Sequence, residues 1–191
     1  MTAHQAALEA LTRYFGYDSF RPGQQGIVEA LLAGRDVLGV MPTGAGKSVC
    51  YQIPAALSPG MTLVISPLIS LMRDQVDALN DLGLPAAFIN TTQTPDEQAM
   101  VFAQAAAGQI KLLYVAPERL ETGRFRDFAA RTPISLIAVD EAHCVSQWGQ
   151  DFRSSYLGIG DFIAGLPQRP PVGAFTATAT ERRSEERRVG K

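Results

Sequence analysis

Short apolar runs alternate with longer amphipathic stretches along most of the chain. Near the start, apolar side chains recur at helical spacing over 7–15 and again over 27–32. Both stretches stop at a glycine, Gly16 and Gly34, a residue that commonly ends helices. The pattern therefore predicts two helices before residue 35.

After residue 36 the apolar runs become short, which is typical of strands, and the stretches between them have helical spacing. The expected strands are 37–41, 62–66, 86–89, 111–115, 136–139 and 172–175. The expected helices are 48–57, 70–82, 96–107, 124–130 and 156–164, the last interrupted by two glycines. Repeated alternation of strand and helix predicts an α/β domain whose mostly parallel central sheet carries helices on both faces.

A glycine-containing loop follows the first expected strand and leads into a helix. Residues 41–48 read MPTGAGKS, so a lysine and a hydroxyl stand where the helix begins. Backbone N–H groups of such a loop close around phosphate oxygens, the lysine reaches the β- and γ-phosphates, and the hydroxyl can ligate Mg²⁺. The expected nucleotide-binding residues here are Thr43, Gly44, Ala45, Gly46, Lys47 and Ser48.

Two adjacent carboxylates, Asp140 and Glu141, follow the strand expected at 136–139. Such a pair is most often a solvated turn, but downstream of a phosphate loop in a parallel sheet it favours hydrolysis of a nucleotide. We expect Asp140 to hold Mg²⁺ and Glu141 to polarise the attacking water, with Lys47 as the third catalytic residue. His143 is expected to have a positional role, because no second histidine or cysteine cluster surrounds it.

Composition excludes several classes of protein. With 46% hydrophobic residues, a net charge of −2 and two cysteines among 191 residues, the chain is neither disordered nor a disulfide scaffold. No apolar run reaches the roughly 18 residues of a membrane helix, and the first residues do not resemble a signal peptide. We expect a cytoplasmic protein, associated with the nucleoid if it is bacterial.

Charge is unevenly distributed. The last 11 residues hold five basic and three acidic side chains, which leaves 12 basic and 16 acidic ones in residues 1–180. An acidic body argues against a domain that binds DNA unaided. The segment 181–191 also lacks apolar periodicity, which suggests a tail that is non-native or a scar of truncation.

The motifs together resemble the RecQ family of superfamily 2 DNA helicases, over about residues 8–180. Besides the phosphate loop and the DEAH sequence of 140–143, the resemblance lies in FGYDSFRPGQ (15–24), SVCYQIP (48–54), SPLISLMRDQ (66–75), YVAPERL (114–120), SQWGQDFR (146–153) and TATAT (176–180). It implies a three-layer RecA-like P-loop NTPase domain over 35–180, preceded by helices with an adenine-recognition motif in 1–34.

The resemblance also implies roles for individual residues. Tyr17 and Arg21 would flank the adenine ring of ATP, and Gln24 would pair with its edges. An amide side chain can donate to and accept from adenine, which favours ATP over GTP. The alternative interpretation is that Tyr17 is a core aromatic and that Gln24 only begins a helix.

Two further groups of residues are implied to link ATP to DNA. Thr176 and Thr178 would hydrogen-bond near Asp140 and His143 and so couple hydrolysis to movement. An aromatic-rich loop would sense single-stranded DNA, since bases stack on aromatic side chains for about 1–3 kcal/mol each. Its residues are Gln147, Trp148, Phe152 and Arg153, and the segments 66–70 and 117–119 would contact the same strand.

The chain departs from the family pattern at Ala45, at Gln150 and over 153–156, where Arg-Ser-Ser-Tyr replaces Arg-Pro-Glu-Tyr. It also contains no second RecA-like domain, which the family needs to complete the ATP site. The expected function is the ATP-binding, Mg²⁺-dependent motor domain of a 3′-to-5′ DNA helicase acting on single-stranded and forked duplex DNA, without unwinding activity as an isolated fragment. The alternatives are a nucleotide-dependent binding module without productive hydrolysis, and a superfamily 2 RNA helicase.

Overall fold

The computed structural model describes residues 1–42, 46–145 and 153–177. Within these ranges the strands form one sheet in the order β1-β6-β5-β2-β4-β3, and every pair of neighbours is parallel. The strands are β1 (Val37–Met41), β2 (Met61–Ile65), β3 (Ala86–Ile89), β4 (Leu112–Val115), β5 (Ile134–Val139) and β6 (Val172–Ala177).

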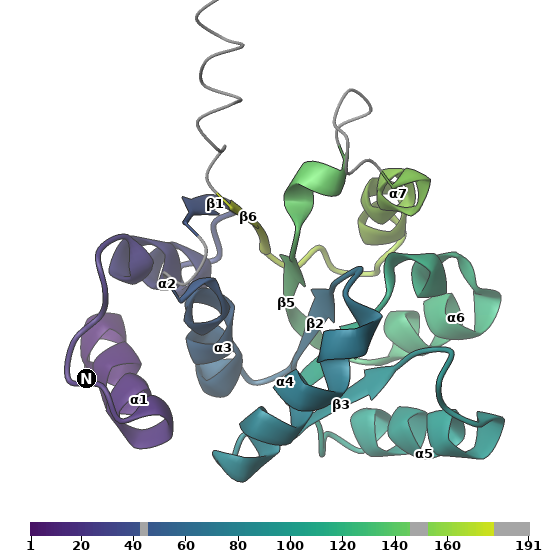
Figure 1. Ribbon diagram of the computed structural model, residues 1–191, viewed down its shortest axis with the longest axis horizontal. Coiled ribbons are helices and arrows are strands. Elements are labelled where there is room, and N and C mark those ends of the chain that lie inside the picture. Colours follow the sequence, from purple (N-terminus) through teal and green to yellow (C-terminus); the bar gives the residue numbers. More distant parts are fainter. Residues whose placement is uncertain (43–45, 146–152, 178–191) are drawn as a thin grey trace, which may run out of the picture.

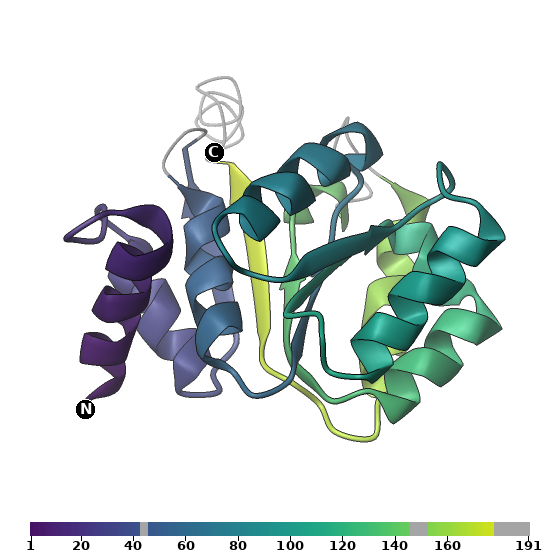
Figure 2. The ribbon, with the colours of Figure 1, turned by 90° about the horizontal axis from the view of Figure 1, so that it is seen from below.

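Helices cover the sheet on both sides, so the domain has three layers (Figure 1). One side carries α3 (Lys47–Leu57) and α4 (Ile69–Asp81), and the other carries α5 (Pro95–Ala106), α6 (Gly123–Arg131) and α7 (Ile159–Ala164). Figure 2 shows α1 (Ala3–Phe15) and α2 (Gln24–Leu32) beside α3, where they share a small apolar cluster that includes Leu11, Val28 and Ile53. Three 3-10 turns complete the described elements: η1 (Pro117–Glu121), η2 (Ala142–Val145) and η3 (Ser154–Gly158).

The strands in the middle of the sheet are buried on both faces. All residues of β2 and of β4 are buried, which explains why these strands are continuous apolar runs in the sequence. At the edge, β1 differs, because Leu38 and Val40 are 69% and 51% exposed. None of the helices in the described part of the chain has the length and hydropathy needed to cross a bilayer.

The expected strands agree with the observed ones to within two residues at each end, and the expected parallel sheet is confirmed. The helix expected over 156–164 is wrong in its first three residues. Residues Ser154–Gly158 form the 3-10 turn η3, and α7 begins only at Ile159. In η3 the Tyr156 N–H donates to the carbonyl of Arg153, three residues back, so the chain follows the tighter 3-10 path there.

Glycines in β1 and β6 make room for a buried aromatic ring. A Cβ at Gly39 would lie 2.9 Å from Phe175, and one at Gly173 would lie 2.8 Å from the same ring. Phe175 is fully buried and packs against Tyr51 of α3 with ring centroids 5.5 Å apart. The ring therefore occupies the space that two missing side chains leave on the sheet.

We predict that Gly39→Ala destabilises the fold by about 1–3 kcal/mol, because overpacking displaces a ring held on all sides. The control is Gly26→Ala at an exposed position of α2 with open space around it, which should stabilise the domain by about 0.5–1 kcal/mol. Urea denaturation followed by circular dichroism measures both changes. Equal effects of the two substitutions would contradict the packing argument.

Candidate active site

The loop between β1 and α3 ends in a geometry suited to an anion. Gly46 precedes α3 with φ +79°, and no side chain caps the helix start. The first N–H groups of a helix have no partner within the helix and carry the positive end of its dipole. The positive φ favours glycine at position 46, and a Cβ there would also lie 2.4 Å from Nε2 of Gln24. Thr43, Gly44 and Ala45 of the expected loop lie outside the described residues.

The two carboxylates follow β5 at the same edge of the sheet. Asp140 extends the strand, because its N–H donates to the carbonyl of Ile65 in β2 at 2.9 Å. The N–H of Glu141 donates to Oδ1 of Asp140 at 2.9 Å. Glu141 has φ +53°, the one non-glycine residue in the described ranges with a positive φ. The chain therefore turns sharply at Glu141, directly after the strand.

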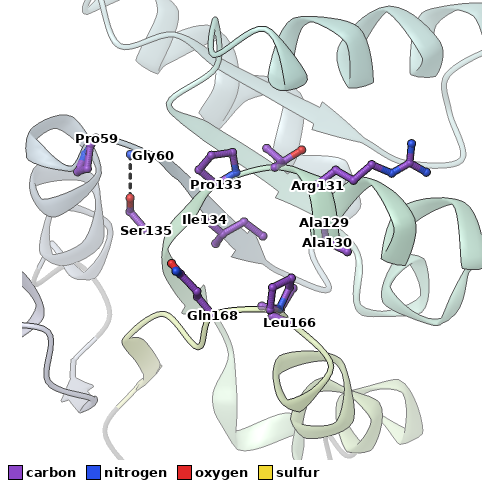
Figure 3. Close-up of a pocket in the computed structure, with 12 residues that line it drawn as sticks. Pro59, Gly60, Ala129, Ala130, Arg131, Pro133, Ile134, Ser135, Leu166 and Gln168 are labelled. Carbon is purple, nitrogen blue, oxygen red and sulfur yellow. Dashed lines mark hydrogen bonds between the residues drawn. The ribbon is translucent and has the colours of Figure 1, made fainter.

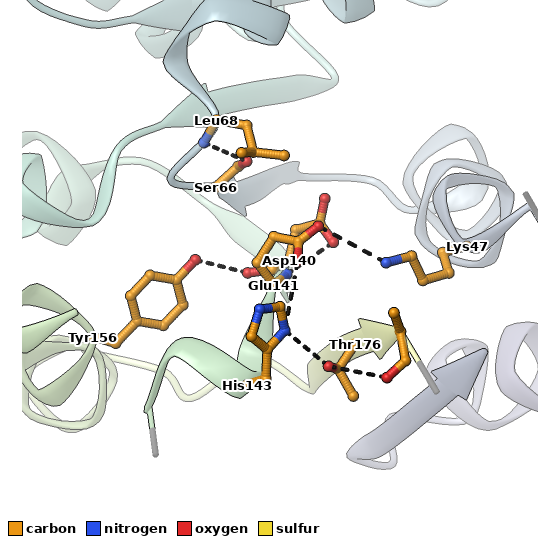
Figure 4. Close-up of polar contacts among 9 residues, drawn as sticks. Lys47, Ser66, Leu68, Asp140, Glu141, His143, Tyr156 and Thr176 are labelled. Carbon is orange, nitrogen blue, oxygen red and sulfur yellow. Dashed lines mark hydrogen bonds and ion pairs between the residues drawn. The ribbon is translucent and has the colours of Figure 1, made fainter. Parts of the chain in front are cut away.

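Glu141 lies between a lysine and a histidine that come from other elements (Figure 4). Its Oε1 is 3.9 Å from Nζ of Lys47 in α3, and its Oε2 is 3.5 Å from Nδ1 of His143. All three side chains are about one-fifth exposed, which leaves them accessible to a ligand. The structure thus brings together Glu141 and Lys47, two of the expected catalytic residues, and His143, for which a positional role was expected.

His143 connects this group to the end of β6. Its Nδ1 is 3.0 Å from Oγ1 of Thr176, so one ring nitrogen lies within reach of both Glu141 and Thr176. Thr176 was expected near His143, and the structure places it there. Thr178 lies outside the described residues.

Burial raises the pKa of Asp140 above its ordinary value of 3.8. The hydrogen bond from the Glu141 N–H and the charges of Lys47 and His143 act in the opposite direction but do not offset desolvation. An ionised Asp140 is therefore a cost to the folded apo protein, and a cation beside it would remove that cost.

The donor set fits Mg²⁺. Ser48 and Asp140 offer a hydroxyl and a carboxylate, which are hard oxygen ligands of the kind Mg²⁺ takes together with waters and substrate phosphates. Among the described residues no group of three or more His, Cys, Asp or Glu could hold a metal ion.

The segment expected to recognise adenine packs directly on the phosphate loop. Gln24 is buried, and its Nε2 donates to the carbonyl of Gly46 at 3.0 Å, while its Oε1 accepts from the N–H of Arg21 at 2.9 Å. The Arg21 guanidinium lies 5.9 Å from the centre of the Tyr17 ring. Tyr17 is 51% exposed, so the alternative that it is a core aromatic is wrong.

The described residues include only part of the segments expected to contact DNA. Gln147, Trp148, Gln150 and Phe152 lie outside the described residues, whereas Arg153 is exposed and its N–H donates to the carbonyl of Cys144. Of the strand-end segment, Ser66 is buried and its Oγ accepts from the N–H of Leu68 at 3.2 Å.

Buried tyrosines adjoin the site, and sequence reasoning gave them no role. Tyr51 lies one helical turn after Ser48, with which it has a side-chain hydrogen bond, and its hydroxyl is 3.4 Å from that of Tyr114 in β4. Tyr156 donates its hydroxyl to the carbonyl of Asp140 at 2.8 Å. A tyrosine within an apolar stretch needs a polar partner when buried, which is the one sequence feature that points to such contacts.

A cavity of about 580 Å³ lies at the opposite end of the strands, where they begin (Figure 3). It is lined by residues that include Pro59, Arg131, Pro133, Leu166 and Gln168. None of the expected site residues lines it. The candidate active site is therefore the strand-end group around Glu141, not this cavity.

The chain is similar in sequence to a known protein family and to several of its members. A model of the DEAD/DEAH box helicase family matches residues 21–186. The chain is 51% identical over 173 residues to the ATP-dependent DNA helicase RecQ of Haemophilus influenzae and 47% identical over 175 residues to that of Bacillus subtilis. Each alignment covers 91% of the chain, but only 28% and 30% of the relative's length. The expected resemblance to RecQ is confirmed.

Solved structures support the fold. The DUF1998 helicase MrfA superposes with a TM-score of 0.71 over 98% of the chain and 31% of its own length, at 18% identity. The helicase Lhr of Mycobacterium smegmatis superposes with a TM-score of 0.66 over 91% of the chain and 24% of its own length, at 20% identity. At such identities these likenesses concern the fold alone.

We predict that Asp140→Asn raises the thermal unfolding midpoint of the nucleotide-free chain at pH 7 by a few degrees. A carboxyl whose folded pKa is raised destabilises the fold above that pKa, and the effect vanishes below pH 3.8, where both states are protonated. The amide keeps an oxygen for the Glu141 N–H. Scanning calorimetry at several pH values measures the shift.

Asp74→Asn, at an exposed position of α4, is the control for the change in net charge and should leave the midpoint nearly unchanged. A lower midpoint for Asp140→Asn at pH 7 would contradict the argument from burial.

Proposed function

Because the chain belongs to the DEAD/DEAH box helicase family and is homologous to RecQ, we propose that it is the ATP-binding motor domain of an ATP-dependent 3′-to-5′ DNA helicase. In the whole protein, such a domain couples ATP hydrolysis to translocation on single-stranded DNA and to unwinding of duplex and forked DNA in repair and recombination. The proposal extends beyond the shared segment, since the chain spans less than a third of each of these two relatives.

One observation carries the proposal: Glu141 lies 3.9 Å from Lys47 and 3.5 Å from His143 at the carboxyl ends of parallel strands. Ligands of parallel α/β sheets bind at that edge. Lys47 is then positioned to contact the β- and γ-phosphates of ATP. Glu141 would orient and polarise the water that attacks the γ-phosphate, and the two neighbours hold its carboxylate in place.

Mg²⁺ would be held by Ser48 and Asp140, and when bound it neutralises charge on the phosphate oxygens. Thr43, Gly44, Ala45 and Gly46 would supply backbone donors to the phosphates. Tyr17 and Arg21, already stacked on each other, would open to take the adenine between them, and Gln24 would read its edge while tied to Gly46.

We assign coupling to the residues that adjoin the carboxylates. The contact of His143 with Thr176 would transmit the state of the ATP site to the segment after β6, which includes Thr178. Gln147, Trp148, Phe152 and Arg153 would bind single-stranded DNA by stacking and by a phosphate contact. A second RecA-like domain would add an arginine to the transition state, an effect of about 10³–10⁵ on kcat in GTPases.

We predict that the isolated chain binds ATP·Mg²⁺ weakly, hydrolyses it slowly and does not unwind DNA, because the second domain's arginine and DNA contacts are needed for full activity. Phosphate release with and without single-stranded DNA, together with a strand-separation assay, measures this. Fast turnover strongly stimulated by DNA would overturn the dependence on a second domain.

We predict that Glu141→Gln lowers the residual turnover by about 10²-fold or more while ATP affinity is retained, because the amide fills the same space but cannot act as a base. Glu9→Gln, at an exposed position of α1, is the matched control and should change neither quantity. If Glu141→Gln leaves turnover unchanged, the chain is a nucleotide-dependent binding module instead of a hydrolase. Competition between single-stranded DNA and RNA for the chain tests the RNA helicase alternative.

A further inference from the structure

The side chain of Tyr156 contacts the backbone of the turn formed by Asp140 and Glu141. It belongs to η3, 16 residues after Asp140, and its side chain is 2% exposed. Its hydroxyl donates to the main-chain carbonyl of Asp140 at 2.8 Å and not to either carboxylate (Figure 4). The contact therefore acts on the backbone at the point where the chain leaves β5 and turns into Glu141.

The backbone at that point needs support. Glu141 has φ +53°, a conformation that residues with a Cβ rarely adopt and that persists only where the surroundings over-determine it. Rotation of Glu141 to an ordinary φ would carry its carboxylate away from Lys47 and His143. The position of the expected catalytic base thus depends on whatever holds this turn.

Four hydrogen bonds form a closed circuit around the turn. The Cys144 N–H donates to the carbonyl of Glu141 at 2.9 Å, the Arg153 N–H to that of Cys144 at 3.0 Å, and the Tyr156 N–H to that of Arg153 at 3.0 Å. The Tyr156 hydroxyl then closes the circuit on Asp140. It is the only link of the four made by a side chain, so one substitution can remove it and leave the others chemically intact.

We propose that Tyr156 is a positioning residue for ATP hydrolysis, holding the Asp140–Glu141 turn so that the Glu141 carboxylate stays between Lys47 and His143. The proposal rests on the proposed function. A tyrosine phenol is protonated at neutral pH, so its hydroxyl is a donor there.

The test is Tyr156→Phe, which removes the hydroxyl and keeps the ring in the core. We expect kcat of the chain to fall about 10- to 100-fold, since small displacements of a catalytic group have effects of this size. The KM for ATP should stay unchanged, because the phosphate loop and Lys47 are not touched. A variant that merely loosened the fold would not separate kcat from KM in this way.

Thr132→Val is the matched control. Thr132 is also buried and donates its hydroxyl to a main-chain carbonyl, that of Phe128, at 2.9 Å. It precedes β5, whereas Asp140 follows it, so this hydroxyl lies at the opposite edge of the sheet and lines the cavity of Figure 3. We expect Thr132→Val to lose comparable stability and to keep the wild-type kcat.

Amide hydrogen exchange by NMR supplies a readout that needs no turnover. In Tyr156→Phe the Cys144 amide should exchange at least about 10-fold faster than in the wild-type chain, as expected when a supporting hydrogen bond is lost. Amides within β2 should be unaffected, and Thr132→Val should leave the Cys144 amide unchanged. In an active chain, unchanged kcat or unchanged exchange overturns the proposal. If the wild-type chain hydrolyses no ATP, the proposed hydrolysis fails, and exchange at Cys144 alone decides whether Tyr156 holds the turn.

Discussion

The common direction of the strands is the constraint on which the candidate active site depends. In the described sheet β1, β6 and β5 are neighbours and parallel, so the segments that follow them emerge at one edge. Lys47 lies more than 90 residues before Glu141 and Thr176 in the sequence. Each of the three nevertheless stands within a few residues of the end of a strand. A reversed strand would send its catalytic residue to the opposite edge, where the cavity near Arg131 lies.

That geometry concentrates unfavourable features in a small volume. Glu141 has a positive φ, which residues with a Cβ rarely adopt, and Asp140 is a carboxylate whose ionisation is opposed by burial. Each destabilises the nucleotide-free fold. Each would also take part in the site when a phosphate, a metal ion and a water molecule are bound. The surrounding framework offsets these costs with apolar strands buried on both faces and with hydrogen bonds that fix the backbone at the strand ends.

The sequence was sufficient to predict elements whose pattern is local. Strands appear as short apolar runs, so β1 and β3 were predicted to the residue. The glycines near residue 158 already weakened the prediction of the helix that begins only at Ile159. The residue types at the strand ends indicated phosphate and carboxylate chemistry. Contacts that depend on the sheet order were not predictable, since Tyr156 meets Asp140, and Gln24 meets Gly46, only after the chain has folded. Nothing local to Glu141 indicates its positive φ, because glutamate has no preference for that conformation.

The family resemblance assigns roles to single residues, whereas the structure shows which of these residues are in contact. The resemblance implied that Thr176 couples hydrolysis to movement near His143, and the structure adds a contact that could serve this role. One imidazole nitrogen is 3.0 Å from the threonine hydroxyl and 3.5 Å from the glutamate carboxylate. Tyr156 offers a second contact of this kind. Its hydroxyl donates to Asp140 in the turn, and its N–H donates to Arg153, which belongs to the segment expected to sense DNA. The strained turn at Glu141 is therefore connected on one side to β6 and on the other to η3. A displacement of either neighbour would change the position of the carboxylate that we propose orients water, and the proposed coupling of DNA binding to ATP hydrolysis requires such a dependence.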